Sequence, residues 1–220
     1  MKNLSVFHFY AKKSARVSFA MLAAATFLAG VSASATAALL LQTDATWLVT
    51  PSNPAPSDWN SNLSFDDSSW QNATILYDVG AVTGDPSFSG TKGIWSSGGQ
   101  FSTSETQVWI RKEFTLGALS AASLIVGCDD DCTVYVNGTQ VINDTNGVAN
   151  NNTVANLLPY LNVGSNLIAY TATDNYLVWG YNHSTWLQLD GQRASVPEPT
   201  TIALLGLGIA SLAATRRSKR

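Results

Sequence analysis

Three consecutive aspartates, Asp129-Asp130-Asp131, stand out as side chains that could do chemistry. Carboxylate oxygens are hard ligands, and Ca²⁺ takes roughly six to eight of them, so this run is a candidate calcium site. The run lacks the alternating spacing and the glycine of a dedicated calcium loop. A solvated acidic turn is therefore the preferred interpretation, with a structural calcium ion as the alternative. No other cofactor is expected.

The remaining ionisable residues argue against catalysis. Hydrolysis of a glycosidic bond normally needs two facing carboxylates about 5–9.5 Å apart. The central part of the chain has only Glu105 and Glu113 as glutamates, and the three aspartates share one predicted turn. A catalytic triad would have to use His183, the single histidine beyond the N-terminal segment. The sequence therefore predicts a protein that is not an enzyme.

Aromatic side chains beside polar residues occur in two predicted loops. Trp179 lies between Tyr176 and Tyr181 in a stretch that also contains Asp and Asn, and Trp95 lies in a glycine-rich stretch. Exposed rings suit the apolar faces of sugars, whereas Asn, Asp and Gln suit the hydroxyl groups. These four aromatic residues are candidate carbohydrate contacts. The alternative for each ring is that it caps the core.

The elements that would carry these residues are short β-strands. Apolar runs rich in Val, Ile, Thr, Tyr and Trp are bounded by clusters of Asn, Gly, Asp and Pro, which is typical of β-sandwiches. We expect strands at 39–49, 73–77, 108–116, 122–128, 132–137, 139–143, 167–172 and 185–189, and long surface loops at 51–56 and 80–99. No long helical period occurs between the termini. The fold class is therefore all-β.

The two cysteines suggest a register for part of the sheet. If Cys128 and Cys132 face each other across the aspartate turn, alternation brings four further apolar residues to the same sheet face. These four residues are Leu124, Val126, Val134 and Val136. Two opposed cysteines in an exported protein are expected to form a disulfide. Asn137-Gly138 then suits a type I′ hairpin turn, because both central positions need positive φ.

The first 37 residues have the pattern of a secretory signal peptide. Four basic residues precede the apolar run from Val17 to Val31, and two A-x-A cleavage sites end at Ala35 and Ala37. Such a segment forms a signal helix that is removed during export. The alternative, an N-terminal membrane anchor, fits less well because the apolar run is short and small residues follow it directly.

The C-terminal 25 residues consist of three parts. A rigid Val196-Pro197-Glu198-Pro199 element is followed by the uncharged stretch from Thr201 to Thr215 and by a basic tip. Because proline lacks the backbone donor, the first part cannot continue a helix. The apolar part is expected to be helical, with the basic tip on the cytoplasmic side. It is short for a permanent span, which needs about 17–25 residues, so a transient anchor is expected.

This order of parts resembles the PEP-CTERM sorting signal of Gram-negative bacteria that make extracellular polysaccharide. The resemblance implies that an exosortase recognises the proline pair and removes the helix and tail. The implied processing determinants are Val196, Pro197, Glu198, Pro199, Arg216 and Arg217. An ordinary membrane anchor is the alternative. The chain would then divide into a signal peptide (1–37), a β-sandwich domain (38–195) and a sorting signal with a transmembrane helix (196–220).

The predicted domain is strongly acidic. Of the 12 Lys and Arg residues of the chain, eight lie in the two terminal segments, which leaves four against 14 acidic residues and a net charge of −10. Such a charge excludes nucleic acid and anionic membrane surfaces as partners.

Four motifs in the domain resemble galactose-binding-like jelly rolls, as in the sugar-binding β-sandwich of glycoside hydrolase family 2. They are Trp59 with Phe65–Trp70, then Trp109–Phe114, Val134–Gly138 and Leu161–Ala169. The resemblance implies a jelly-roll architecture and no activity, since these motifs are fold markers. Lys112 shares an alternation face with Ile110 and Phe114, which predicts a bulge or an exposed edge.

These observations predict an exported, surface-sorted and non-catalytic protein of the envelope or extracellular polysaccharide matrix that binds carbohydrate. The competing hypothesis is a structural matrix protein that binds other proteins through an exposed face carrying Ile125, Thr133 and Tyr135. The expected partners are an exosortase, extracellular polysaccharide and, through the C-terminal helix, the membrane. After transient anchoring, the protein would reside at the outer surface or in the matrix.

Overall fold

The computed structural model describes residues 37–54, 57–98, 105–175, 183–194, 206–209 and 211. Ala35–Ala194 form one compact unit. Residues 206–209 and 211 are helical, and within the described residues no helix has the length and apolar character to cross a membrane. The predicted signal helix lies outside the described residues, as do Val196–Pro199, Arg216 and Arg217.

The described part of this unit folds into two antiparallel six-stranded sheets. Sheet I has the spatial order β10 (Asn150–Val154), β7 (Leu119–Asp129), β12 (Ser184–Arg193), β5 (Lys92–Trp95) and β4 (Thr74–Asp78), and β1 (Ala38–Gln42) also pairs with β12. Sheet II has the order β3 (Gln71–Asn72), β2 (Leu48–Thr50), β6 (Gln107–Leu116), β11 (Gly164–Thr173), β8 (Asp131–Val136) and β9 (Thr139–Asp144). In the described part of this unit, the short helices α2 (Val79–Thr83) and η1 (Pro86–Phe88) lie between β4 and β5 of sheet I, and η2 (Leu158–Tyr160) lies between β10 of sheet I and β11 of sheet II. The all-β sandwich predicted from the sequence is confirmed.

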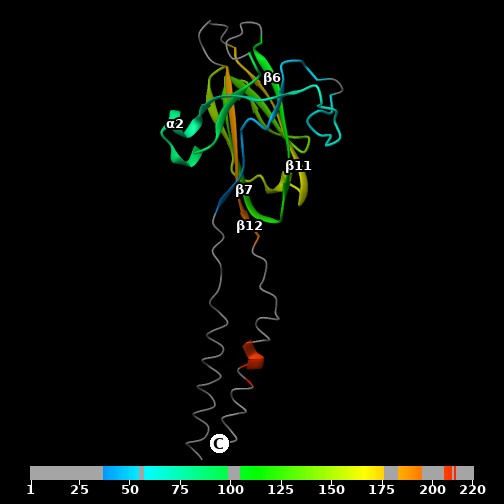
Figure 1. The fold of residues 1–220 in the computed structure, drawn as a ribbon, viewed down its shortest axis with the longest axis vertical. Helices are drawn as coiled ribbons and strands as arrows, with labels where there is room; N and C mark the ends of the chain where they lie inside the picture. The colour runs from blue at the N-terminus through cyan, green and yellow to red at the C-terminus, as the bar shows by residue number, and fades with distance from the viewer. Residues whose placement is uncertain are drawn as a thin grey trace, which may run out of the picture. The chain divides into compact units, whose positions relative to one another are not determined.

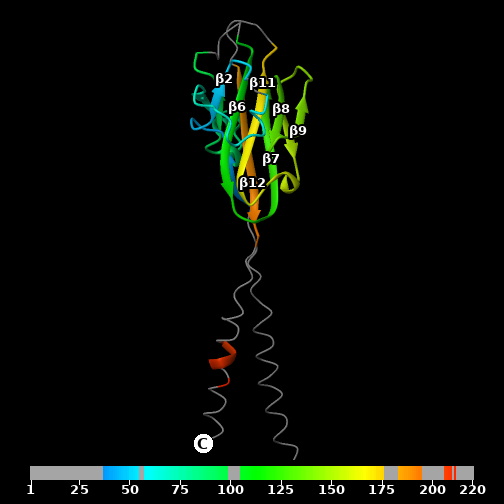
Figure 2. The ribbon, with the colours of Figure 1, turned by 90° about the vertical axis from the view of Figure 1, so that its right-hand side faces the viewer.

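The two sheets form the two layers of the sandwich. Figure 1 shows α2 on the side of sheet I, with β6 and β11 of sheet II on the opposite side. Figure 2 shows sheet II with β2, β6, β11, β8 and β9 following one another across the view. The core lies between the layers, because alternate residues of each strand point inward. Leu124 and Val126 of β7 and Val134 and Val136 of β8 are at most 1% exposed, and each such burial contributes about 1.5–3 kcal/mol.

The hairpin predicted for residues 122–137 is wrong, although its inward face is right. β7 pairs with β10 and β12 in sheet I, whereas β8 pairs with β11 and β9 in sheet II. The predicted Cys128–Cys132 disulfide is present, with a Cα–Cα distance of 5.9 Å. Because the chain crosses between the sheets at Asp130, this disulfide joins the two layers. Alternation cannot distinguish two neighbouring strands from two facing strands, because both place the same residues in one core.

The crossing also divides the surface that was predicted to bind proteins. Ile125 lies on sheet I, whereas Thr133 and Tyr135 lie on sheet II, at the other side of the sandwich. Tyr135 contacts Trp59 edge-on, with ring centroids 6.2 Å apart. The three residues therefore do not form one exposed face.

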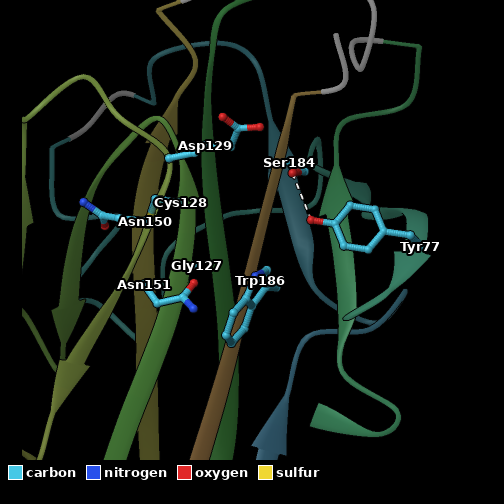
Figure 3. Close-up of a pocket in the computed structure, with 9 residues that line it drawn as sticks. Tyr77, Gly127, Cys128, Asp129, Asn150, Asn151, Ser184 and Trp186 are labelled. Atoms are coloured by element: carbon cyan, nitrogen blue, oxygen red, sulfur yellow. Dashed lines mark hydrogen bonds between the residues drawn. The ribbon is translucent and has the colours of Figure 1, made fainter. Parts of the chain in front are cut away.

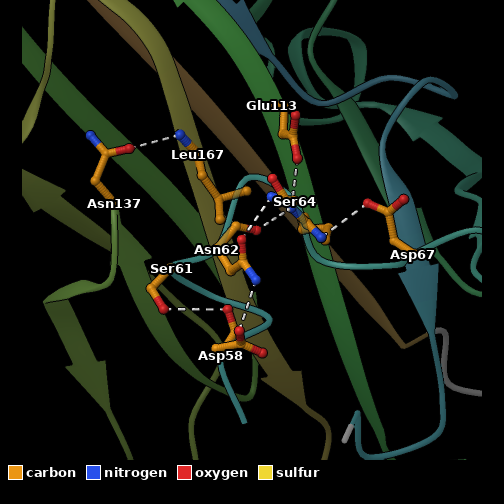
Figure 4. A network of polar contacts seen from close by, with 9 residues as sticks. Asp58, Ser61, Asn62, Ser64, Asp67, Glu113, Asn137 and Leu167 are labelled. Atoms are coloured by element: carbon orange, nitrogen blue, oxygen red, sulfur yellow. Dashed lines mark hydrogen bonds and ion pairs between the residues drawn. The ribbon is translucent and has the colours of Figure 1, made fainter. Parts of the chain in front are cut away.

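The Asn137-Gly138 turn between β8 and β9 is confirmed. Asn137 has a φ of 50° and Gly138 a φ of 82°, as a type I′ turn requires. The Asn137 side chain also accepts a hydrogen bond from the Leu167 N–H of β11 at 2.8 Å (Figure 4). This contact fixes the end of the hairpin to the adjacent strand.

Two other expectations need correction. The strand predicted at 39–49 is divided between the sheets, because Asp44 accepts the Thr46 N–H and turns the chain between β1 and β2. The loop predicted at 80–99 contains α2, η1 and the buried strand β5. Strand β5 is only four residues long, and β10 is an Asn-rich edge strand, so neither has the apolar alternation that predicts a strand.

Candidate functional site

The outer face of sheet I contains a pocket of about 300 Å³, within the size range of small-ligand sites. Figure 3 shows its residues, which come from four strands and the turn before β10. The lining residues are Tyr77, Gly127, Cys128, Asp129, Ala149, Asn150, Asn151, Ser184 and Trp186.

Strand register explains why these residues meet. Asn151 of β10 and Trp186 of β12 both stand opposite Gly127 of β7, so the three positions form one row across the outer face. Asp129 stands opposite Ser184 and forms the next row. Tyr77 extends this second row, because its hydroxyl lies 3.0 Å from the Ser184 hydroxyl (Figure 3).

Two glycines allow two aromatic rings to lie against the sheet. A Cβ atom at Gly127 would overlap the indole of Trp186, and a Cβ atom at Gly93 would overlap the phenol of Tyr77. Phe88 of η1 packs against Trp186 from the side, with ring centroids 4.7 Å apart. The two rings are therefore held in place before any ligand arrives, which lowers the entropic cost of binding.

Asp129 gives the pocket an ionisable group at neutral pH. Burial, together with the nearby Asp174 and Asp130 carboxylates and partly opposed by His183, raises the pKa of Asp129 to about 6. Burial also raises the pKa of the Tyr77 hydroxyl, with a smaller contribution from Asp129. Asp129 is the only charged side chain among the residues that line the pocket.

The histidine does not form a catalytic triad with the serine next to it. His183 bonds through Nδ1 to Asp174 and packs against Trp95, with ring centroids 5.3 Å apart. Ser184, the next residue in the chain, bonds to Tyr77 in the pocket. Since neighbouring residues near a strand start point to opposite faces, hydroxyl and imidazole lie on different sides of the sheet.

The aspartate triplet is hydrogen-bonded to neighbouring segments of the chain. Asp130 accepts the Asn175 N–H at 2.9 Å, and Asp131 accepts the Gly147 N–H at 2.7 Å and the Asn175 side-chain amide. These bonds use oxygens that an ion would need, and they hold the loops that enclose the layer crossing. Within the described ranges, no group of three or more His, Cys, Asp or Glu side chains is arranged to hold a metal ion.

The predicted aromatic contacts have different outcomes. The expectation for Trp95 is wrong, because its side chain is 0% exposed and belongs to the core between the sheets. Tyr176, Trp179 and Tyr181 lie outside the described residues. Sequence reasoning missed Trp186, which looked like a core residue within a predicted strand. Gly127 in mid-strand was the available signal, because such a glycine often marks a close approach by another group.

The outer face of sheet II differs in being covered by residues 57–70. Fully buried Arg111 of β6 forms ion pairs with Asp67 at 3.1 Å and Glu113 at 2.7 Å, and its guanidinium lies 5.2 Å from the Phe65 ring centroid. Trp59 packs against Trp70 in the same cover. Figure 4 shows the polar contacts of this segment, including Asn62 with Asp58.

The motifs noted in the sequence therefore hold this cover on sheet II. Lys112 donates to the Thr46 carbonyl, and β2 pairs with β6 only as far as Arg111. The pairing of β6 with β11 has no break in register. Of the two expectations for Lys112, the exposed edge is confirmed and the bulge is not.

Several solved structures are similar to this chain. A β-glycosidase from Bacteroides vulgatus is 19% identical with a TM-score of 0.46, and the match covers 70% of this chain and 20% of the enzyme. A glycosyl hydrolase family 2 member from Bacteroides cellulosilyticus is 20% identical with a TM-score of 0.42, covering 67% and 20%. A β-glucuronidase from Bacteroides uniformis is 16% identical with a TM-score of 0.43, covering 70% and 18%.

Each match spans about a fifth of the enzyme, so the activities in these names belong to those longer proteins. A comparison of the sequence with curated proteins found no match. Residues 195–218 match the family model described as the PEP-CTERM protein-sorting motif. The chain thus carries a PEP-CTERM sorting signal, which implies export and sorting to the cell surface.

Proposed function

We propose that the sandwich is a non-catalytic carbohydrate-binding module of jelly-roll type that acts at the cell envelope or in the extracellular polysaccharide. The observation that carries this proposal is the pocket on sheet I. It combines the edges of two fixed aromatic rings with a carboxylate, a hydroxyl pair and the amides of Asn150 and Asn151. Apolar surface for C–H groups and polar atoms for hydroxyl groups are what a sugar ring requires.

The setting of the pocket supports the same function. The sorting signal sends the protein to a surface where polysaccharide is available. The domain charge of −10 disfavours nucleic acid and anionic lipid. The pocket residues offer one carboxylate where glycoside hydrolysis needs two, so binding without cleavage is the proposed role.

Processing is part of the proposal. An exosortase would cut near Pro197, Glu198 and Pro199 after the apolar segment has held the chain at the membrane for a time. Measuring the intact mass of the secreted form tests this step. A mass that ends before residue 200 supports it, and a secreted form that retains Arg216 and Arg217 contradicts it.

A glycan array with the labelled full chain tests the binding function. We expect saturable binding that free oligosaccharide competes away, and a loss of about fivefold or more for Trp186→Ala, since an aromatic contact of this kind contributes about 1 kcal/mol or more. Asn151→Ala removes an exposed amide and keeps the core intact, so it tests the pocket if the tryptophan variant is unstable. Trp70→Ala, on the other sheet, is the matched control.

The array also separates the competing function. A structural matrix component would give no saturable sugar signal with the folded chain, and that result would reject carbohydrate binding. Equal losses for Trp186→Ala and Trp70→Ala would keep sugar binding but remove this pocket as its site.

A further inference from the structure

The pocket contains a carboxylate, that of Asp129, which forms no ion pair with a basic side chain of the described residues. Each of the four basic side chains of the domain either bonds to another group or lies away from Asp129. Lys92 pairs with Asp78, Arg111 pairs with Asp67 and Glu113 on sheet II, Lys112 donates to Thr46, and Arg193 ends β12.

The basic residues and the histidine of the domain all lie within the described residues. Residues 99–104 and 176–182 contain no Lys, Arg or His. The groups that act on Asp129 are the carboxylates of Asp174 and Asp130, the Tyr77 hydroxyl and His183. Of these only His183 can become cationic, and it is bonded to Asp174 and packed on Trp95. The field in the pocket is therefore negative.

We propose that the pocket selects a sugar bearing a free amino group, whose ammonium pairs with the Asp129 carboxylate, and that it rejects uronic acids. This inference rests on the proposed function and names its ligand class. A half-buried carboxylate such as Asp129 gains from a ligand that brings its own positive charge and excludes water, whereas a second carboxylate would face repulsion from Asp129, Asp130 and Asp174.

The ring-lined shape distinguishes an amino sugar from other amines. Tyr77 and the edge of Trp186, which is 6% exposed, lie beside the carboxylate, and Asn150 and Asn151 line the opposite wall (Figure 3). A linear polyamine or a lysine side chain has the ammonium group but lacks the hydroxyl groups that the amides would bind. Asp129 is thus the residue that determines specificity, and the rings and amides recognise the sugar.

The test is calorimetric titration of the full chain, in mild detergent, with four matched tetrasaccharides at pH 7. They are oligomers of glucosamine, of N-acetylglucosamine, of glucose and of a uronic acid. We expect the glucosamine oligomer to bind at least about tenfold more tightly than the two neutral oligomers, and the uronic acid oligomer not to bind. Spermidine and a lysine-rich peptide should not compete.

Asp129→Asn should remove the preference for the amino sugar, so that the glucosamine oligomer binds no more tightly than the neutral oligomers. The matched control is Asp190→Asn, which makes the same charge change four residues beyond Trp186 on β12. If both variants weaken binding of the glucosamine oligomer equally, the oligomer is attracted by the overall negative charge of the domain and the inference is overturned. It is also overturned if the uronic acid binds, if neutral oligomers bind as well as the amino sugar, or if spermidine competes. If no oligosaccharide binds at all, the proposed function itself fails.

Discussion

The two outer faces of the sandwich use similar residues for different purposes. On sheet II, Trp59, Phe65 and Trp70 cover the strands, and Arg111 ties the cover down through Asp67 and Glu113. On sheet I, Trp186 and Tyr77 lie against glycines and leave a pocket beside them. Both faces carry aromatic rings and a pocket, but Arg111 in the sheet II pocket is paired with Asp67 and Glu113, whereas Asp129 in the sheet I pocket belongs to no ion pair of the described residues.

The difference shows that the role of an aromatic ring on the outer face of a β-sandwich depends on the charged groups beside it and on whether these are paired. A charged side chain that forms ion pairs within the fold, as Arg111 does, has a role in packing. A charged group in a pocket without a counter-ion, as Asp129 is, marks a place where something else can bind. The comparison leads to four expected outcomes.

The largest effect is expected for Arg111→Ala. The change removes a side chain that is 1% exposed and leaves Asp67 and Glu113 unpaired, although water can partly solvate these two carboxylates. We expect a loss of about 2–3 kcal/mol in unfolding free energy, measured by urea denaturation. Lys112→Ala, one residue along, should cost far less. Sugar binding of the folded Arg111→Ala fraction should be unchanged, and its loss would show that the two faces are coupled.

On sheet I, Gly127→Ala should mainly reduce sugar binding, whereas Arg111→Ala on sheet II should mainly reduce stability. The new methyl group must displace the Trp186 ring into the pocket, so we expect loss of sugar binding with a moderate stability cost of about 1–3 kcal/mol. Gly117→Ala is the control, because no atom lies near its added Cβ. Titration and thermal melting on both variants measure the two effects. If the Gly127→Ala variant binds sugar as well as the parent chain does, the Trp186 indole is not part of the binding site.

Asp129→Asn should change how stability depends on pH. The raised pKa means that the folded state holds the proton more tightly, so the unfolding free energy falls as pH rises from about 4 to about 6. Asparagine has no such transition. We expect the variant to gain melting temperature relative to the parent chain as pH rises across this window. Parallel melting curves from pH 4 to 7 for both proteins would refute the argument.

The smallest effect is expected from calcium. Because backbone and side-chain N–H groups occupy oxygens of Asp130 and Asp131, millimolar calcium should leave the melting temperature unchanged. Magnesium at equal ionic strength is the control. A calcium-specific rise that Asp130→Ala abolishes would restore the metal site.

Sequence reasoning identified the strands whose apolar alternation is long, such as β6, β7, β8 and β11. It also identified the disulfide, because Cys128 and Cys132 occupy inward positions on either side of a turn. It could not tell that the turn crosses between sheets, since facing and neighbouring strands share one inward pattern. Strand β5, with Gly93 under Tyr77, had too few apolar residues to be recognised.

The pocket was only partly predictable. Asp129 was identified only as part of a solvated acidic turn, with a calcium site as the alternative, because linear spacing cannot show that Asp130 and Asp131 turn toward backbone groups. The row from Asn151 to Trp186 joins residues from β10 and β12 through β7, and only the pairing of the strands reveals it.

The two ends of the domain emerge together. Ala38 at the start of β1 pairs with Gly191 near the end of β12, while Trp186 lies seven residues before Arg193, about 23 Å along the strand. The C-terminal segment that carries the sorting signal therefore leaves the domain at the opposite end of β12 from Trp186. Under the proposed function, cleavage in that segment would leave the pocket residues of the strand untouched.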